Sequence, residues 1–262
     1  MMSNTTPAKH LNIRAAAVAM VLSLGLVTAP AHSAQDTPES QAVTTQTRSE
    51  ALSAKQQTIP LIASFMAASE MPKLNAALHQ GLDAGLTVSE AKEVLVHLYA
   101  YVGFPRSLNA LGELLKVVDA RKQRGIEDAP GREPSRAIPT GDQLLAVGTA
   151  NQTKISGAPV KNAVTDFAPV INQFLQTHLF GDIFERDNLD WQSRELATVG
   201  ALAATPGADP QLRSHMAASM RTGLTAAQMR QLTEVLAEHG DTQAAKRASV
   251  ALTQALAAAS AR

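Results

Sequence analysis

The sequence predicts an all-α protein, and three observations support this prediction. The 262 residues include only one Trp, two Tyr and six Phe, so Ala, Leu and Val must build the core, which favours close-packed helices over sheets. From residue 50 onward, almost every start and stop signal is helical. The second half of the chain repeats these signals, which predicts a tandem repeat of one helical module packed about a pseudo-twofold axis.

The N-terminal 34 residues have the features of a secretory signal peptide. Lys9 and Arg14 precede an apolar run from Ala15 to Val27, and small residues follow at the expected cleavage positions. We therefore expect a periplasmic or secreted protein, with an uncleaved anchor as the alternative. The apolar run is short for a membrane span, and no later segment is long enough, so no membrane partner is expected after cleavage. Residues 35–50 are polar, which predicts a disordered segment.

The remaining residues divide into two helical halves and a linker. The first half is residues 51–124, with helices expected at about 52–68, 72–85, 88–102 and 105–124. Thr87 and Glu90 form a capping box, and Pro72 and Pro105 mark helix starts. Residues 125–165 are rich in Pro and Gly at their start, which predicts a linker with a short helix at about 141–150 and a polar loop at 151–159.

The second half is residues 166–262. Helices are expected at about 166–179, 191–204 and 210–222, followed by two more. Asp190 is the expected N-cap of one helix and Asp209, followed by Pro210, that of the next, which Gly223 ends. The triplet Gly-Leu-Thr at 223–225 repeats the triplet at 85–87, and each begins a capping box.

Glu195 and His215 form a candidate acid–base pair on two neighbouring helices of the second half. The short connection makes these helices antiparallel, and the two residues are offset by about 6 Å along the axes, roughly one turn. Helix axes pack about 8–10 Å apart, so the two side chains can meet. A carboxylate that orients a His is a common unit for proton transfer. The alternative is a helical hairpin whose Glu and His face solvent.

The two halves differ in their polar residues. The first half lacks a Glu–His pair but contains His97 and Tyr101, one turn apart in the segment HLYAYVGFPRSLNAL. Two halves of one composite site would have this division, and so would a decayed repeat without a site.

Composition excludes several classes of function. The formal net charge is zero and the pI is about 7.1, so no basic field for nucleic acid is present. The chain has no Cys, which excludes disulfides, thiolate metal sites and cysteine redox chemistry. His97, His178, His215 and Glu195 have no metal-binding spacing such as H-E-x-x-H, so no metal site is expected.

The segments HLFGDIFERDNLDWQSRELATVGALAA, LRSHMAASMRTGLT and HLYAYVGFPRSLNAL resemble the carboxymuconolactone decarboxylase family in an exported tandem form, over about residues 55–255. The resemblance implies an all-α fold whose modules associate as trimers or hexamers. A homo-oligomer, with a trimer favoured, is therefore the expected assembly.

In relatives that resemble alkyl hydroperoxidases, a Glu and a His flank a Cys pair. Glu195 and His215 match the Glu and His positions with their spacing preserved, whereas residues 208–212, where the Cys pair would fall, read Ala-Asp-Pro-Gln-Leu. Thiol-based hydroperoxidase activity is therefore disfavoured, because no thiolate can reduce a peroxide.

The decarboxylase-like branch needs no Cys and no cofactor. We expect a small organic acid as substrate, with His215, Glu195 and Tyr101 as catalytic residues. Arg194 or Arg213 is expected to bind a carboxylate or oxyanion, and His97 to line the substrate pocket. The alternative is a helical scaffold or small-molecule binder without catalysis.

Overall fold

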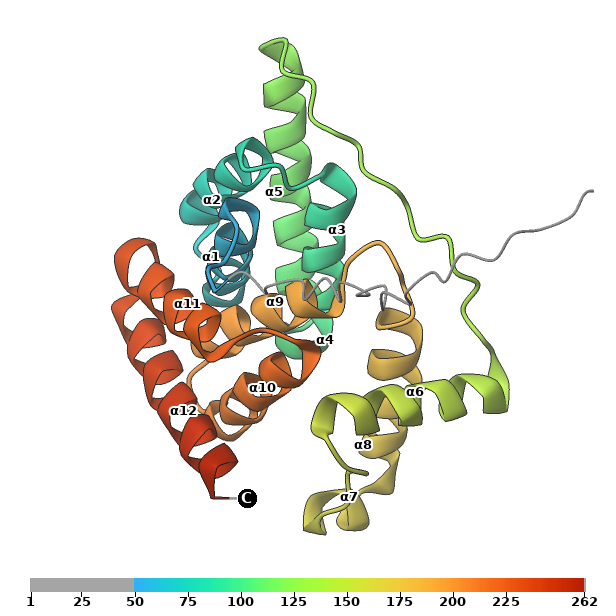
Figure 1. Ribbon diagram of the computed structural model, residues 1–262. Coiled ribbons are helices and arrows are strands. Elements are labelled where there is room, and N and C mark those ends of the chain that lie inside the picture. Colours follow the sequence, from blue (N-terminus) through green and yellow to red (C-terminus); the bar gives the residue numbers. More distant parts are fainter. Residues whose placement is uncertain (1–49, 262) are drawn as a thin grey trace, which may run out of the picture. The chain divides into compact units, whose positions relative to one another are not determined.

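The structure is a computed structural model that describes residues 50–261, and every regular element in this range is a helix (Figure 1). The predicted all-α fold class is thereby confirmed. The predicted signal peptide at residues 1–34, and all of the predicted disordered segment except residue 50, lie outside the described residues. Within residues 50–261, no helix combines the length and apolar character needed to cross a membrane.

The first half contains the helices at the places where the sequence predicts them. They are α1 (Ala54–Ala68), α2 (Met71–Asp83), α3 (Val88–His97), α4 (Tyr99–Val102) and α5 (Phe104–Gln123). The capping box of Thr87 and Glu90 begins α3 as predicted. One expectation is wrong: the helix expected to run unbroken to residue 102 is divided at Leu98. The amide of Tyr101 donates to the carbonyl of Leu98 at 3.0 Å, a three-residue hydrogen bond that tightens the turn there.

The segment between the two halves is more helical than its sequence indicates. It contains α6 (Gly141–Ser156), α7 (Ala163–Phe167), α8 (Pro169–Phe174) and a π-helix, η1 (Leu175–Ile183). The helix expected at 166–179 is thus three shorter elements, since the capping box of Asn162 begins α7 and Pro169 begins the next element.

The polar loop expected at 151–159 is wrong for its first part, because α6 continues to Ser156. Asn151 donates to the carbonyl of Phe180 at 2.9 Å, and Gln152 donates to Asn172 at 2.9 Å. These polar side chains face α8 and η1 instead of solvent. A run that reads as a loop therefore forms the polar contact between packed helices.

The second half contains α9 (Trp191–Ala203), α10 (Asp209–Thr222), α11 (Ala226–His239) and α12 (Thr242–Ser260). Asp190 caps α9 by accepting from the amide of Ser193 at 2.7 Å, and Gly223 ends α10 with φ +112°, both as predicted. Asp209 is not the N-cap of α10: it is the first helical residue, and the cap position is Ala208, which has no side-chain acceptor.

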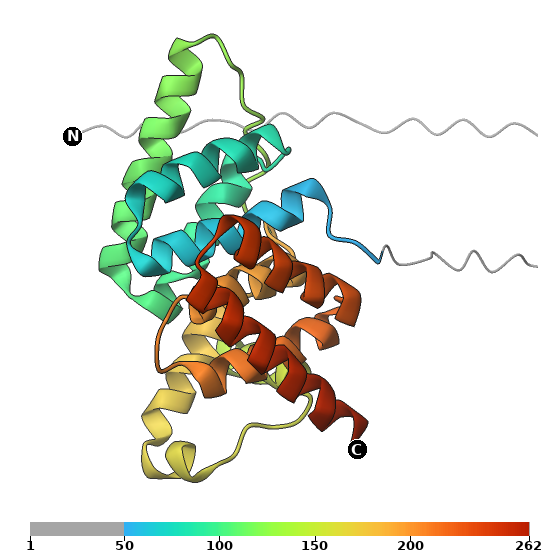
Figure 2. The ribbon, with the colours of Figure 1, turned by 90° about the vertical axis from the view of Figure 1, so that its left-hand side faces the viewer.

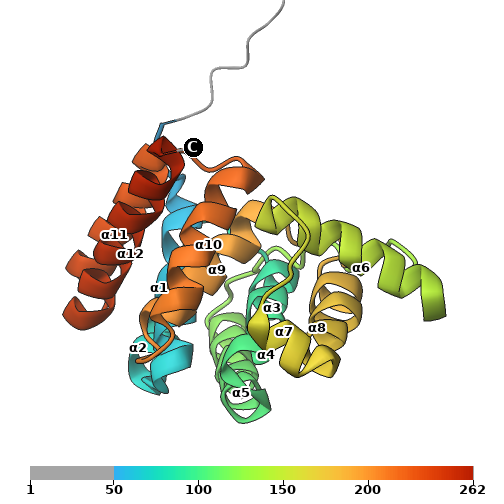
Figure 3. The same ribbon diagram turned by 90° about the horizontal axis from the view of Figure 1, so that it is seen from below.

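Helices α1 and α9 pack against each other at the centre of the described residues. Helix α2 packs on α1 as α10 packs on α9, and each half reaches the other, since α11 contacts α1 and α3 contacts α9. Figure 2 shows α1, in blue, next to the red helices of the second half. In Figure 3, α6, α7 and α8 lie together on the side of α10 that faces away from α11 and α12. The reciprocal contacts support the predicted tandem repeat, which itself stays a prediction.

Gly200 allows the close approach of the two central helices. A Cβ atom at this position would lie 2.7 Å from the Cα atom of Pro60 in α1 and would overlap the carbonyl oxygen of that residue. Those backbone atoms belong to a buried helix, so they cannot move aside as a flexible side chain would. A side chain at position 200 would therefore push α1 and α9 apart.

We predict that Gly200→Ala lowers the free energy of unfolding by about 1–3 kcal/mol, the usual cost of overpacking a buried contact. Gly112→Ala is the matched control, because nothing lies within 4 Å of a Cβ atom added at this exposed position in α5. The control should raise stability by about 0.5–1 kcal/mol, since Ala is the better helix former. Urea unfolding followed by circular dichroism measures both, and equal stabilities would contradict the close-contact argument.

Candidate functional site

Glu195 on α9 and His215 on α10 are in direct contact. The Nδ1 atom of His215 lies 2.8 Å from Oε2 of Glu195. The Glu195 side chain is completely buried, whereas that of His215 is 16% exposed. The predicted meeting of the two side chains is confirmed, and the alternative in which both face solvent is wrong. An ionised carboxylate accepts from Nδ1–H, which leaves Nε2 of a neutral imidazole as the reactive nitrogen.

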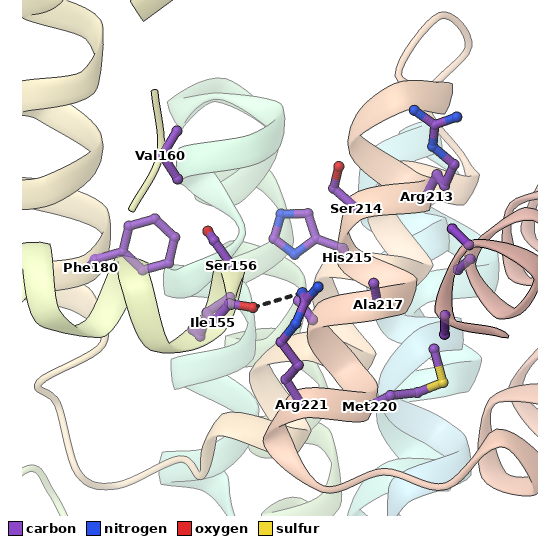
Figure 4. Close-up of a pocket in the computed structure, with 14 residues that line it drawn as sticks. Ile155, Ser156, Val160, Phe180, Arg213, Ser214, His215, Ala217, Met220 and Arg221 are labelled. Atoms are coloured by element: carbon purple, nitrogen blue, oxygen red, sulfur yellow. Dashed lines mark hydrogen bonds between the residues drawn. The ribbon is translucent and has the colours of Figure 1, made fainter. Parts of the chain in front are cut away.

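His215 lines a pocket of about 910 Å³. One wall comes from the end of α6 and from η1, including Ile155 and Phe180, and the facing wall comes from α10 and α12. Figure 4 shows the imidazole of His215 directed between these walls. None of the residues of the described chain that line this pocket is acidic. Its charged lining residues are Arg213 and Arg221, so the pocket favours an anionic guest.

The two arginines of the pocket differ in position. Arg213 is exposed and its guanidinium points away from the His215 ring in Figure 4. Arg221, which the sequence analysis did not single out, donates through Nη1 to the carbonyl of Ile155 at 3.1 Å. It thereby joins α10 to the opposite wall. The only sequence signal for Arg221 is its place on the same helix as His215, which is weak by itself.

Arg194 does not line the pocket. Its side chain is completely buried, and Nη2 donates to Oε1 of Glu93 at 2.9 Å and to the carbonyl of Arg186 at 2.7 Å. The expectation that Arg194 binds substrate is not supported by this position, because the side chain leaves α9 towards α3 and not towards α10.

His97 and Tyr101 lie behind the Glu195–His215 pair. The rings of Tyr101 and His215 are 5.5 Å apart in an edge-to-face arrangement, and those of His97 and Tyr101 are 5.2 Å apart. Side chains from the two halves of the chain therefore form one cluster. Neither residue lines the pocket, however, so the expectation that His97 does so is wrong: its side chain is completely buried.

Burial keeps both of these residues neutral. It lowers the pKa of His97 well below the ordinary value, and the nearby charges of Arg194 and His215 lower it further. Burial also raises the pKa of Tyr101, an effect that the Glu195 carboxylate increases. The inner part of the cluster thus adds no charge of its own at neutral pH.

Several buried polar atoms of this cluster have no hydrogen-bond partner among the described residues. They are Nδ1 of His97, the hydroxyl of Tyr101, Nε and Nη1 of Arg194, and Oε1 of Glu195. Each buried unsatisfied group costs about 1–3 kcal/mol, so their concentration around one pair requires an explanation that ordinary core packing does not supply. In the described range, no group of three or more metal-ligating side chains is placed to hold a metal ion.

A buried ion network supports the cluster from the side of α3. Glu93, whose side chain is 1% exposed, binds Arg186 at 2.8 Å and Arg194 at 2.9 Å. Burial alone would raise the pKa of Glu93, but the hydrogen bonds and charges of the two arginines outweigh it and hold the pKa below 4.5. Glu93 comes from the first half and both arginines from the second, so the network joins the two halves.

Residues 169–255 match the sequence model of the Carboxymuconolactone decarboxylase family. This part of the chain is therefore similar to that family. The family predicted from the sequence is confirmed over this range, and the resemblance of the first half stays a prediction. A search of the curated proteins found no match. The matched residues include the Glu195–His215 pair and most of the residues that line the pocket, whereas His97 and Tyr101 lie outside them.

We predict that Glu93→Gln destabilises the protein by about 3–5 kcal/mol, because it leaves two arginines near the core without their counter-charge. Glu70→Gln is the control, since Glu70 is half exposed and its contact with Lys73 is 3.7 Å long. The control should change stability by less than about 0.5 kcal/mol. Chemical denaturation at pH 7 measures both variants, and a small effect of Glu93→Gln would contradict the network.

The same network should make the stability of the protein depend on pH in the acid range. The pKa of Glu93 is lowered in the folded protein, so its contribution to stability is complete above 4.5, the ordinary pKa. This contribution is lost as the pH falls from 4.5 towards the lowered pKa of Glu93 in the folded protein. Over that range the wild type should lose more stability than Glu93→Gln does.

Proposed function

We propose that this protein is a cofactor-free enzyme that uses Glu195 and His215 to transfer a proton in the decarboxylation, or a related lactone reaction, of a small organic acid. The observation that carries the proposal is the 2.8 Å contact between a completely buried carboxylate and an imidazole that lines a pocket. Glu195 holds the orientation of the imidazole from behind, and His215 faces the guest.

The chemistry requires one proton and no external electrons. When the C–C bond to the carboxylate breaks, carbon dioxide leaves and the bonding electron pair stays on the substrate as an enolate. Nε2–H of a protonated His215 then gives its proton to the substrate carbon, forming a C–H bond. The buried Glu195 carboxylate stabilises the protonated imidazole that the step needs. A proton from solvent restores His215 for the next turnover.

The pocket fits the proposed substrate class. A guanidinium matches the geometry of a carboxylate, and Arg221 uses Nη1 on the carbonyl of Ile155, while its other N–H groups can bind a substrate oxygen. The rest of the lining is largely apolar, with Ile155, Phe180 and several Ala residues. An organic acid with one anionic end and a small apolar body suits this combination.

A non-catalytic binding protein is the second candidate. It is favoured by the burial of Tyr101 and His97 behind the pair, because His215 is then the only predicted catalytic residue that lines the pocket. A thiol-based hydroperoxidase is not proposed, since the chain contains no Cys.

Carboxymuconolactone in D₂O is the probe that separates the two candidates. An enzyme should release carbon dioxide and incorporate deuterium at carbon, which proton NMR detects. We predict that His215→Ala lowers turnover by about 10²–10⁴-fold, the range for loss of a general acid. Ser214→Ala, a neighbouring pocket residue, is the control and should retain turnover. Helicity should be unchanged in both.

Binding of the probe without turnover in the wild type would favour the binding protein. Full activity of His215→Ala would remove this residue from the mechanism.

The proposal includes export and self-association. Export rests on the signal-like features of residues 1–34. Self-association is supported by exposed apolar side chains on α5 and on α7 and α8, which include Leu108 at 64% and Phe167 at 92% exposure.

We predict that the full chain, expressed in a bacterium and recovered from the periplasm, lacks about 30 N-terminal residues, the usual length of a signal peptide. Native mass spectrometry of this material should show a homo-oligomer, with a trimer favoured. Full-length monomers in the cytoplasmic fraction would contradict both parts.

A further inference from the structure

Thr198 connects the two halves of the buried cluster. It lies on α9, one turn after Glu195, and its side chain is completely buried. Its hydroxyl oxygen lies 2.8 Å from Nε2 of His97, which comes from the first half. The same hydroxyl lies 3.0 Å from the carbonyl of Arg194, to which it donates. A Thr within a helix has no distinctive sequence signal, so this contact is not predictable from the sequence.

The directions of these two hydrogen bonds identify the protonated nitrogen of His97. A hydroxyl has one hydrogen, which Thr198 gives to the carbonyl of Arg194, so it can only accept from His97. Nε2 of His97 must then carry the proton, and Nδ1 must have a free lone pair. With the opposite arrangement, Thr198 would donate to His97 and lose its bond to Arg194. A buried Nδ1–H without a partner would also result.

The groups that face His97 favour the same form. Arg194 places a buried positive charge and unpartnered N–H groups in this cluster, and His215 lies nearby. A neutral ring adds no charge beside Arg194, whereas a protonated ring would add to the positive charge. Glu195 adds a second acceptor to the cluster through Oε1, and Glu93 neutralises Arg194 from the other side. Phe184 covers His97 edge-on at 5.5 Å.

We propose that Thr198 is a positioning residue of this site, which holds the His97 ring in place beside Tyr101 in the neutral form protonated at Nε2. This inference deepens the proposed function and rests on it for its kinetic part only. The ring of His97 packs against that of Tyr101 at 5.2 Å, and the Tyr101 ring in turn packs edge-to-face with that of His215 at 5.5 Å. The ring of His97 behind His215 then does not change charge as the substrate reacts.

The ring nitrogens of His97 give a direct test. In protein labelled with ¹⁵N at histidine, the wild-type spectrum should show a protonated Nε2 and an unprotonated Nδ1 for His97, unchanged between about pH 5 and 8, the range in which an ordinary His titrates. Loss of the His97 signals in His97→Asn assigns them. A protonated Nδ1, or titration of this ring within the range, would overturn the proposal.

Variants of Thr198 separate positioning from packing. Thr198→Val keeps the shape but removes the hydroxyl, so it should give a mixture of His97 tautomers and lower turnover of carboxymuconolactone about tenfold, which corresponds to about 1.4 kcal/mol. Thr198→Ser should restore both the single tautomer and the turnover. Thr205→Val is the matched control, because Thr205 donates to the carbonyl of Ala201 at 2.9 Å just beyond the end of the same helix.

An unchanged His97 spectrum in Thr198→Val would refute the positioning role. If Thr198→Val does not fold, the wild-type and Thr198→Ser spectra still decide the tautomer. The spectra do not depend on turnover, so failure of this inference is distinguishable from failure of the proposed function, which the His215→Ala comparison tests.

Discussion

The close contact between α1 and α9 is the constraint on which the rest of the structure depends. Gly200 removes the side chain that would separate the two helices, and the backbone of Pro60 occupies the space. Because α9 is buried at the centre, its side chains contact helices of both halves. One face of the helix carries Arg194 and Thr198 towards α3, and another carries Glu195 towards α10. The cluster forms because side chains on α9 contact both α3 and α10.

The interior of this arrangement contains more charge than an apolar core normally tolerates. Glu93, Arg186 and Arg194 neutralise one another in pairs that connect the halves, and their bonds leave parts of Arg194 unsatisfied. Breaking such a network costs several kcal/mol, while keeping it adds little net stability. We therefore interpret the network as fixing the position of α3 relative to α9. That position brings His97 into contact with Thr198.

His215 stands at the border between this dry interior and the pocket. On its inner side the groups are neutral or paired, and on its outer side the pocket carries arginines and no acidic residue among its described lining. In the proposed reaction, Glu195 therefore holds the imidazole from behind, and the other side of the ring faces an anionic guest. The π-helix η1 contributes Phe180 to the facing wall, and π-helices are frequent at functional sites. The chain has no Cys, which excludes thiol chemistry, and the acid–base chemistry that we propose depends on the Glu195–His215 pair.

Local signals in the sequence were sufficient for most helices of the two halves, because capping boxes, prolines and glycines act within a few residues of one another, but not for the segment between the halves, where the helices are longer or more divided than predicted. Asp190 and Thr87 cap the helices that they were predicted to cap, and Gly223 ends the helix that it was predicted to end. The Glu195–His215 contact was also predictable, since a short connection makes two helices antiparallel and fixes their register. The direction of Arg194, the burial of His97 and the role of Thr198 were not predictable. Each depends on the angular position of a residue on a helix that packs against a segment about a hundred residues away, and only tertiary packing decides that angle.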